Sequence, residues 1–404
     1  MSIRMNHRRL SDLSAHARGW LLDAAELWQA ERDGETRLFP ERLSIEGDRD
    51  ACPHRLFVQA RHVSSYCELG RLGWSGPWRQ MVTANIDFLV KEGRRSDGFY
   101  VHRFDHEARV LDARADLYDQ AFMLLALAHA GRALERPDLF TRAEELGDAV
   151  NESWRLPHGG YFEGEIAVCP PCRQNPHMHL LESFIELHRA TGSQRWRRDA
   201  ERVAQFCARS FLQPGTGALL EYLGAGLGPL EGEEGRVSQP GHCFEWAWLF
   251  ERLAEWNPPD ATGFSDRLVQ FARRHGLDPV RGVAVDEVRT DGSIRNASAR
   301  LWPQAERLKA ALARLRRTGE AEERAEAAAS YAGLVRYFDT PVRGLWRDKL
   351  LPDGSWVEEP SPGSSLYHIT GALAELIDTA HAAGGQAIPN GAGKPSPLPT
   401  IRPV

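Results

Sequence analysis

The 404-residue sequence lacks the features that mark several broad classes of protein. It has no apolar run of about 18 residues, the length that a membrane-spanning helix requires. It has only six cysteines, too few for a disulfide scaffold. Charge of one sign is not in large excess either, because 50 Lys and Arg residues stand against 56 Asp and Glu residues. A net charge of −6 provides no basic surface for nucleic acid, so we expect neither a nucleic-acid nor a membrane partner.

The beginning of the chain also lacks a secretory signal. Its first ten residues are basic, but Ser11, Asp12 and His16 follow where a signal peptide would have an apolar segment. We therefore expect a cytoplasmic protein with reduced cysteines. Hydrophobic residues make up 42% of the chain, which is enough for a full core and excludes global disorder.

Only the last twenty residues look unable to pack against a core. Residues 385–404 contain five prolines and almost no large apolar side chains, so we predict a disordered tail there. Residues 1–384 contain no other long linker. We expect them to form one domain, although the length alone would suggest two or three domains of about 150 residues each.

What the sequence does contain is a repeat of about sixty residues. Short glycine turns recur at intervals of 62, 57, 65 and 62 residues, and their members are Gly98, Gly160, Gly217, Gly282 and Gly344. Between these turns lie polar clusters, each of which begins a mostly apolar helical segment. The clusters lie 57, 61, 63, 62 and 64 residues apart when they are represented by Arg61, Tyr118, His179, His242, Gln304 and His368. Six regular units indicate a repeat architecture.

Each repeat contains two kinds of helix. Residues 121–128 are apolar on all sides, as expected of a helix that is buried all round. In the helix that follows, Leu139, Ala143, Leu146 and Val150 form a single apolar stripe. Solenoid repeats of about 34 to 47 residues have similar helices throughout, whereas this longer unit alternates inner and outer helices. We therefore predict an all-α (α/α)6 barrel of six inner and six outer helices, with short β-hairpins in the connecting loops.

In such a barrel the six polar clusters meet at one end. His179 and Glu182, like His242 and Glu245, are three residues apart, so each pair lies on one face of a helix. A nearby carboxylate fixes the tautomer of an imidazole and raises its basicity. Three histidines around one pocket, with Arg61 to stabilise an oxyanion, suit the abstraction of a proton beside a carbonyl group.

Two motifs suggest other chemistry but lack the context for it. Cys169 and Cys172, followed by His177 and His179, have some metal-ligand spacing, yet no second CxxC and no HExxH accompany them. The glycine-rich segment 224–228 has no strand-then-helix setting that would form a phosphate cradle. We therefore expect no metal and no cofactor.

The polar clusters resemble those of the N-acylglucosamine 2-epimerase superfamily, in order and at the expected spacing, from about Arg55 to His368. The matching segments are residues 55–61 (RLFVQAR), 117–122 (LYDQAF), 173–179 (RQNPHMH), 240–246 (PGHCFEW), 301–306 (LWPQAE) and 364–368 (SSLYH). The resemblance implies an (α/α)6 barrel and a metal-free isomerase or 2-epimerase that acts on sugars. These segments look most similar to the mannose isomerase branch.

The resemblance also implies roles for individual residues. The catalytic histidine pair falls on His242 and His368, a third functional histidine on His179 and the substrate arginine on Arg61. Glu245 would orient His242. Further contacts with the substrate are expected from Tyr118, Asn175, Glu182, Trp302, Gln304 and Glu306.

The implied reaction begins when one imidazole removes the C2 proton of an open-chain aldose, giving a cis-enediolate. Return of the proton to C1 gives a ketose, whereas return to the other face of C2 gives an epimer. We expect an aldose–ketose isomerase that interconverts D-mannose and D-fructose, as a monomer or homodimer. The alternative is a 2-epimerase that acts on N-acylglucosamine, on glucose and mannose, or on cellobiose.

Three further interpretations are open at this point. A phosphorylated sugar would need several cationic side chains near the pocket, and Arg61, Arg173 and Lys309 are candidates. An inverting glycosidase would need two carboxylates as acid and base, but the periodic positions hold histidine more often. A sugar-binding protein without activity is the third, although the three periodic histidines argue against it.

Overall fold

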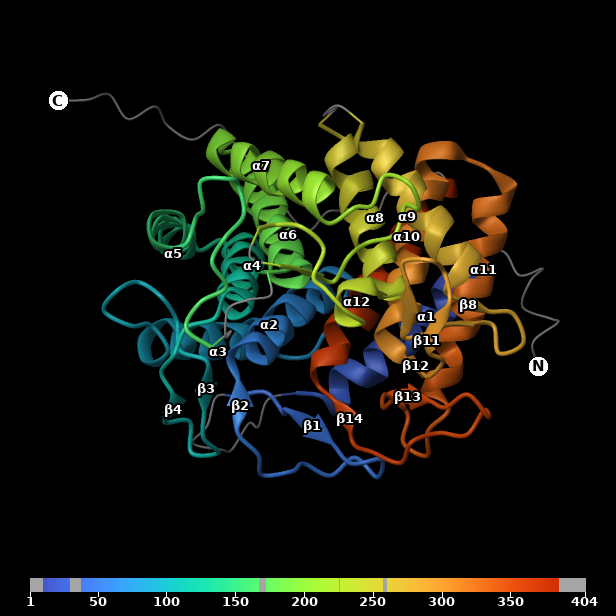
Figure 1. Ribbon diagram of the computed structural model, residues 1–404. Coiled ribbons are helices and arrows are strands. Elements are labelled where there is room, and N and C mark those ends of the chain that lie inside the picture. Colours follow the sequence, from blue (N-terminus) through green and yellow to red (C-terminus); the bar gives the residue numbers. More distant parts are fainter. Residues whose placement is uncertain (1–9, 30–37, 167–171, 225, 257–259, 385–404) are drawn as a thin grey trace.

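Helices make up most of the chain, and the strands between them are short (Figure 1). The computed structural model describes residues 10–29, 38–166, 172–224, 226–256 and 260–384. The predicted tail, residues 385–404, lies outside the described residues. The described part contains twelve α-helices and two 3-10 helices, η2 (Glu234–Arg236) and η3 (Arg336–Phe338). None of these described helices combines the length and apolarity that crossing a bilayer requires.

Six inner helices form a closed ring. They are α2 (Leu56–Arg71), α4 (Leu117–Leu134), α6 (Gln174–Thr191), α8 (Pro240–Ala254), α10 (Leu301–Thr318) and α12 (Ser364–Ala383). Each contacts the next in this order, and α12 contacts α2. Residues 121–128 of α4 are all buried, because helices or side chains surround them on every side. This confirms the expectation for the fully apolar helical segment.

Six outer helices cover this ring. They are α1 (Leu10–Leu27), α3 (Trp78–Glu92), α5 (Pro137–Ser153), α7 (Gln194–Ser210), α9 (Ala261–His275) and α11 (Ala321–Val335). Each packs on an inner helix with one apolar face, and in α5 this face contains the predicted stripe of Leu139, Ala143, Leu146 and Val150. The two layers confirm the predicted (α/α)6 barrel.

The first helix of the chain, α1, fills the outer position that the sixty-residue repeat did not locate. It packs mainly against α12, the last inner helix, and also contacts α2 (Figure 1). Its Trp20 ring stacks on Phe338 with 3.8 Å between the ring centroids, and Leu13, Ala17 and Leu21 are buried beside it. The outer layer is therefore completed by a segment from the opposite end of the sequence.

Short antiparallel strands lie in the connecting segments, as the glycine turns predicted. They form six small sheets: β1 (Arg42–Leu43) with β14 (Ser361–Pro362); β2 (His54–Arg55), β3 (Arg103–Phe104) and β4 (Val110–Asp112); β5 (Cys172–Arg173) with β6 (Tyr222–Leu223); β7 (Val237–Ser238), β10 (Glu287–Arg289) and β11 (Ile294–Asn296); β8 (Leu277–Asp278) with β9 (Val283–Ala284); and β12 (Ala299–Arg300) with β13 (Lys349–Leu350). In several of these sheets, a strand that leads directly into an inner helix pairs with a strand of the next repeat. In one of them, Arg173 of β5 lies opposite Tyr222 of β6. The sheets thereby fix where the inner helices begin.

In five of the connecting segments, one backbone carbonyl accepts a hydrogen bond from the beginning of an inner helix. The backbone N–H groups of Leu56, Leu117, Gln174, Leu301 and Gly363 donate to the carbonyl oxygens of His102, Glu163, Glu221, Asp348 and Glu41, respectively, at 2.8–3.1 Å. Most of these acceptors lie four residues after a glycine in the left-handed region, such as Gly217 (φ 76°) before Glu221. The glycine turn therefore places one side chain beside the inner helices in most repeats, and this side chain is usually acidic.

Candidate active site

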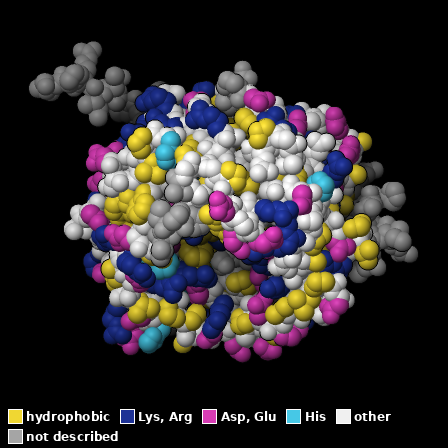
Figure 2. Space-filling view, viewed as in Figure 1, with side chains coloured by type: hydrophobic (Ala, Val, Ile, Leu, Met, Phe, Trp, Pro, Cys, Tyr) yellow, Lys and Arg dark blue, Asp and Glu magenta, His cyan; other side chains and the backbone are white. Residues whose placement is uncertain are grey.

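The beginnings of the inner helices surround one end of the barrel. Figure 2 shows a hollow in the face of the molecule that is viewed in Figure 1, with Lys and Arg side chains along its border. Six helix N-termini around one space create a positive potential, because their backbone dipoles point the same way. Such a space favours a ligand or intermediate with negative charge.

His368, near the beginning of α12, is held by a carboxylate of the neighbouring inner helix. Its Nδ1 lies 2.7 Å from Oε1 of Glu306 on α10. A carboxylate can only accept in this bond, so Nδ1 carries the proton and Nε2 has a lone pair. Burial is the main cause that lowers the pKa of His368 well below its usual value, so the imidazole is neutral at pH 7.

His242 has a different carboxylate partner from the one expected. Its Nδ1 donates to Oε2 of Glu221 at 2.8 Å, and Glu221 comes from the segment between α7 and β6 rather than from α8. The expectation that Glu245 orients His242 is therefore wrong. The carboxylate of the neighbouring repeat approaches Nδ1 more directly than a side chain one turn further along the same helix. Glu221 also accepts from Gln239 N at 3.0 Å and from Gln174 Nε2 at 2.9 Å, which fixes its position.

His179 and Glu182 form the expected pair on one face of α6. His179 Nδ1 lies 3.1 Å from Glu182 Oε2, and the other carboxylate oxygen accepts a hydrogen bond from the Tyr367 hydroxyl. Burial lowers the pKa of His179 to about 4, so it is neutral at pH 7. The pKa of Glu182 is lowered to about 2: burial, the largest single effect, raises it, but the hydrogen bond from His179 and the charge of Lys309 outweigh that effect.

Arg61 on α2 brings its positive charge into the same pocket. Its Nη2 donates to the Tyr118 hydroxyl at 2.7 Å and its Nη1 to the carbonyl of Ser364 at 3.1 Å. The guanidinium also lies over the Phe122 ring, 4.3 Å from its centroid. The Tyr118 ring in turn meets His179 edge to face at 5.2 Å, so the predicted Arg61, Tyr118 and His179 are in one constellation.

Glu245 lies at the centre of the buried charges. Possible ligand atoms of Glu245 lie within 4.8 Å of those of His179 and Glu182 on one side, and of Glu306 and His368 on the other. Its Oε1 is buried and has no hydrogen-bond partner among the described residues. Burial and then the charge of Glu306 raise the pKa of Glu245 well above its usual value.

Two cations oppose the charge of two glutamates in this pocket. Lys309 pairs with Glu306 through Nζ and Oε2 at 2.8 Å, and Glu306 and Lys309 are both buried. Arg61 is the second cation, and Glu182 is the second carboxylate. Balanced charge matters here because an uncompensated buried ion would be strongly destabilising.

Trp302 provides an aromatic surface between the two catalytic histidine candidates. Its ring centroid lies 4.8 Å from that of His242 and 5.7 Å from that of His368. A Cβ atom on Gly241 would lie only 2.6 Å from this ring, so the glycine allows the close approach of Trp302. The two imidazoles thus flank one space, which is the arrangement expected of a proton-transfer pair.

Gln304 does not face this space. Its Oε1 accepts from Ala284 N at 2.7 Å, and its Nε2 donates to the carbonyls of Ala284 at 2.8 Å and Arg300 at 2.9 Å. The amide is fully used in holding the backbone, which corrects the expectation that Gln304 binds the substrate. Asn175 differs, because its Oδ1 has no hydrogen-bond partner among the described residues and is available to a ligand.

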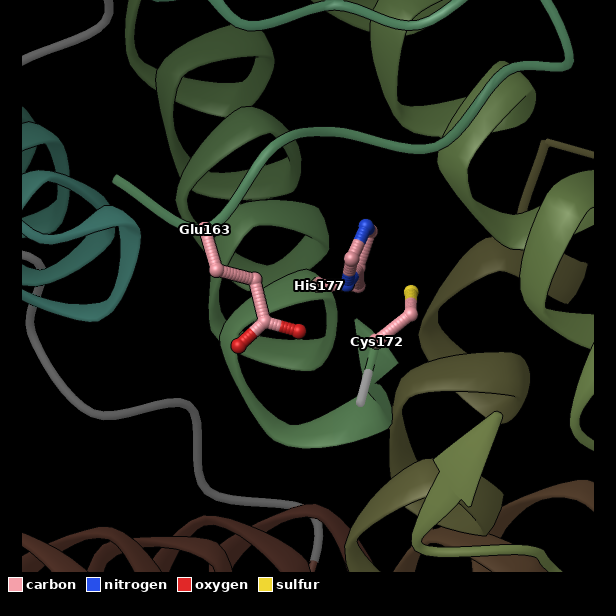
Figure 3. A group of neighbouring side chains, drawn as sticks. All are labelled: Glu163, Cys172 and His177. Atoms are coloured by element: carbon pink, nitrogen blue, oxygen red, sulfur yellow. The ribbon is translucent and has the colours of Figure 1, made fainter. Parts of the chain in front are cut away.

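The cysteine and histidine motif that resembles a metal site is shown in Figure 3. Glu163, Cys172 and His177 have their ligand atoms within 4.8 Å of one another. However, His177 Nε2 accepts from Tyr161 N at 2.9 Å and Nδ1 donates to the Arg173 carbonyl at 2.8 Å. Both ring nitrogens are therefore occupied by the backbone, and His177 has no lone pair for a metal. Cys169 lies outside the described residues.

Comparison with known proteins places this site in a family. The family described as N-acylglucosamine 2-epimerase (GlcNAc 2-epimerase) matches residues 39–372. The chain belongs to this family. It is therefore an enzyme of the isomerase and epimerase type, and the site above lies within the matched region.

Relatives of this N-acylglucosamine 2-epimerase family member carry two kinds of name. A mannose-6-phosphate isomerase of Rhizobium meliloti (strain 1021) is 38% identical over 370 residues, which cover 89% of this chain and 95% of that protein. A D-mannose isomerase of Thermobifida fusca is 27% identical over 301 residues, covering 67% of this chain and 71% of that protein.

Solved structures share the fold of this family member at lower identity. A D-mannose isomerase superposes with a TM-score of 0.83 at 19% identity, covering 90% of this chain and 98% of that one. The cellobiose 2-epimerase from Spirochaeta thermophila DSM 6192 gives a TM-score of 0.83 at 21% identity, covering 93% and 98%. Isomerases and epimerases therefore share this barrel.

Three residues of the site were not found from the sequence: Glu221, Lys309 as an ion-pair partner, and Tyr367 as a donor to Glu182. A signal for Glu221 does exist. It follows a glycine in the left-handed region by four residues, as Glu163 follows Gly159 and Asp286 follows Gly282. No comparable pattern marks Lys309.

Proposed function

We propose that this chain is an aldose–ketose isomerase that interconverts D-mannose and D-fructose by proton transfer through a cis-enediolate. The observation that carries the proposal is the pair of imidazoles beside Trp302, each with a carboxylate on Nδ1: His368 on Glu306 and His242 on Glu221. In each ring Nε2 is the basic nitrogen, which is the arrangement that a general base needs.

The reaction starts from the open-chain sugar. His179, which contacts Arg61 through Tyr118 and is neutral, assists ring opening or binds the enediolate. One of His368 and His242 removes the C2 proton, and the electron pair moves into a C1–C2 double bond while the C1 carbonyl oxygen gains negative charge. Arg61 and the positive end of the helix ring stabilise that charge.

The second step determines the product. If a histidine returns the proton to C1 while the proton of the O2 hydroxyl passes to the O1 oxyanion, O2 becomes the carbonyl oxygen and the product is fructose. If the proton returns to the opposite face of C2, the product is the epimeric aldose, glucose. The Trp302 ring, Asn175 and Glu245 are the groups that orient the enediolate between the two histidines.

Mannose 6-phosphate is the second candidate substrate, and the name of the 38% identical relative favours it. The three candidate cations support it less. Lys309 is buried on Glu306, Arg61 is bonded to Tyr118, and Arg173 at the border of the site is already paired with Glu163. For this reason the unphosphorylated sugar is the first choice.

Incubation with D-mannose in deuterated water, followed by NMR, tests the proposal. Fructose with deuterium at C1 is the expected result, with mannose 6-phosphate as a parallel substrate. Glucose with deuterium at C2 would instead identify a 2-epimerase. His368→Ala should abolish exchange, whereas His129→Ala, a histidine outside the site, should retain it. Absence of exchange with every aldohexose and with mannose 6-phosphate would refute the proposal.

A further inference from the structure

Lys309 is a buried lysine directly behind the catalytic histidine candidate His368. It lies on α10, one turn after Glu306, and its Nζ is 2.8 Å from Glu306 Oε2. The other oxygen of the same carboxylate, Oε1, lies 2.7 Å from His368 Nδ1. Glu306 therefore connects an ammonium group on one side to an imidazole on the other.

Aromatic and ionic contacts beneath Lys309 fix its position. Its Nζ lies 3.8 Å from the centroid of the Trp248 ring on α8, a cation–π contact in a desolvated setting. The Trp248 indole N–H donates to Glu375 on α12 at 2.8 Å, and Glu375 is paired with Arg316 and Arg252. The Trp248 ring beneath Lys309 is therefore itself held in place, and Lys309 cannot move away without losing its contacts with both Glu306 and Trp248.

The carboxylates around Lys309 require its charge. The charged and titratable groups near Glu306 come from five inner helices: Arg61, His179, Glu182, Glu245, Lys309 and His368. Burial is the largest effect on Glu306 and raises its pKa, while Lys309 opposes that effect. The pKa of Lys309 is itself raised by Glu306, Glu245 and Glu182, which outweigh its burial. Lys309 is therefore an ammonium ion at pH 7.

Two other roles for Lys309 do not fit these contacts. A lysine that forms a Schiff base must be a neutral amine at working pH, but the three carboxylates keep this one protonated. A lysine that binds a substrate phosphate must reach the pocket, but Nζ is enclosed between Glu306 and Trp248. Its partners point instead to an effect on Glu306.

We propose that Lys309 is a positioning residue whose cation keeps Glu306 a carboxylate and thereby holds His368 in the tautomer with a free Nε2. This inference rests on the proposed function, in which His368 Nε2 exchanges a proton with the sugar. Without the cation, Glu306 takes up a proton beside Glu182 and Glu245. Its new O–H then donates to His368 Nδ1, and the imidazole proton moves to Nε2, where it blocks proton abstraction.

The test replaces Lys309 and observes His368 directly. Lys309→Met removes the charge and retains the length, whereas Lys309→Arg retains a cation that stacks on tryptophan. Arg307→Met is the matched control, because Arg307 is also a buried cation of α10 but pairs with Glu326 of the outer helix α11 at 2.7 Å. The ¹⁵N shifts of His368, identified by their loss in His368→Asn, report which ring nitrogen carries the proton.

We expect the proton on Nδ1 in the wild type, in Lys309→Arg and in Arg307→Met, and on Nε2 in Lys309→Met. At pH 7 the kcat of Lys309→Met should fall about 100-fold, the low end of what a positioned base contributes. A 100-fold loss at pH 7 places the acidic limb of its kcat/KM profile about two units above pH 7, so that activity recovers at higher pH.

An unchanged Nδ1–H tautomer in folded Lys309→Met, or the same kcat loss at every pH, would overturn the proposal. So would a change of tautomer in folded Lys309→Arg, which decides the matter if the Met variant does not fold. Because the tautomer is read from the protein itself, it remains decisive even if the wild type shows no exchange with mannose. That last result would count against the proposed function alone.

Discussion

His242 on α8 donates its Nδ1–H to Glu221, a residue 21 positions earlier in the chain, at 2.8 Å. The pair joins two consecutive repeats, because Glu221 also accepts from Gln174 at the beginning of α6. A carboxylate held from two sides is well suited to fix the ring orientation of a catalytic histidine.

Glu221→Ala should therefore lower kcat more than it raises KM. We expect a loss of about 100-fold in kcat, because the His242 ring loses both its orientation and its tautomer control. Steady-state kinetics on the sugar measures this. The matched control is Glu234→Ala, an exposed glutamate of η2 that pairs with Arg295; it should keep wild-type kcat. Equal activity of the two variants would contradict the role of Glu221.

Gly241→Ala should impair the site without touching a polar group. The new methyl would approach the Trp302 ring to 2.6 Å, so the ring must shift from its place between His242 and His368. We expect a fall in kcat/KM of about 10- to 100-fold, since displacement by about 1 Å is costly in a positioned site. Gly226→Ala, where nothing lies within 4 Å of the added atom, is the control. Unchanged kinetics in Gly241→Ala would show that the ring position is not critical.

Gln304→Ala should affect stability rather than substrate binding. The change leaves the buried Ala284 N–H and carbonyl without their partner, which costs about 1–3 kcal/mol in the free energy of unfolding. The KM of the folded variant should stay within about twofold of the wild type, because the Gln304 amide contacts the backbone and not the pocket. The loss of 1.4 kcal/mol in substrate binding would instead raise KM about tenfold. Chemical denaturation and kinetics on one preparation compare the two. A large rise in KM at wild-type stability would restore Gln304 to the substrate site.

His177 makes the unfolding free energy depend on pH between about 6.5 and 4. Burial lowers its pKa to about 4 in the folded protein, whereas the unfolded chain binds a proton near 6.5. The unfolded state then holds more protons in this window, so the contribution of His177 to stability is present above pH 6.5 and is lost as the pH falls.

His177→Gln should remove this loss while retaining the contact. Gln59, Gln120 and Gln304 occupy the equivalent place in other helices and clasp a backbone N–H and carbonyl in the same way. Between pH 6.5 and 5.5 the variant should lose about 1 kcal/mol less than the wild type in unfolding free energy. Denaturation at both values measures the difference. His106→Gln, an exposed control, should behave as the wild type, and so would His177→Gln if the pKa argument failed.

The barrel could be predicted from the sequence because glycine turns, polar clusters and apolar helices recur about every sixty residues. The inner helix at residues 121–128 and the outer stripe from Leu139 to Val150 were both correct, since burial alone decides which residue types occupy them. The helix α1 was not located, because it lies before the first polar cluster and follows no preceding glycine turn.

Only those residues of the site that lie on the inner helices themselves could be predicted from the sequence. Arg61, Tyr118, His179 and His368 share one pocket because the repeat brings the helix beginnings together. The partner of His242 could not be predicted from helical spacing, because Glu221 approaches from a different segment. Gln304 also lies at the periodic position, but its side chain is bonded to Ala284. Sequence periodicity alone does not distinguish a side chain that faces the pocket from one that faces the backbone.

The packing of α1 against α12 also has a consequence for the order of assembly. Helix α1 precedes α12 in the chain, so it has no partner on α12 until α12 has been synthesised. Its apolar face, with Trp20 and Leu21, must stay uncovered or be shielded until then. The barrel can therefore close only after α12 has been synthesised, with α1 and α12 as its final seam.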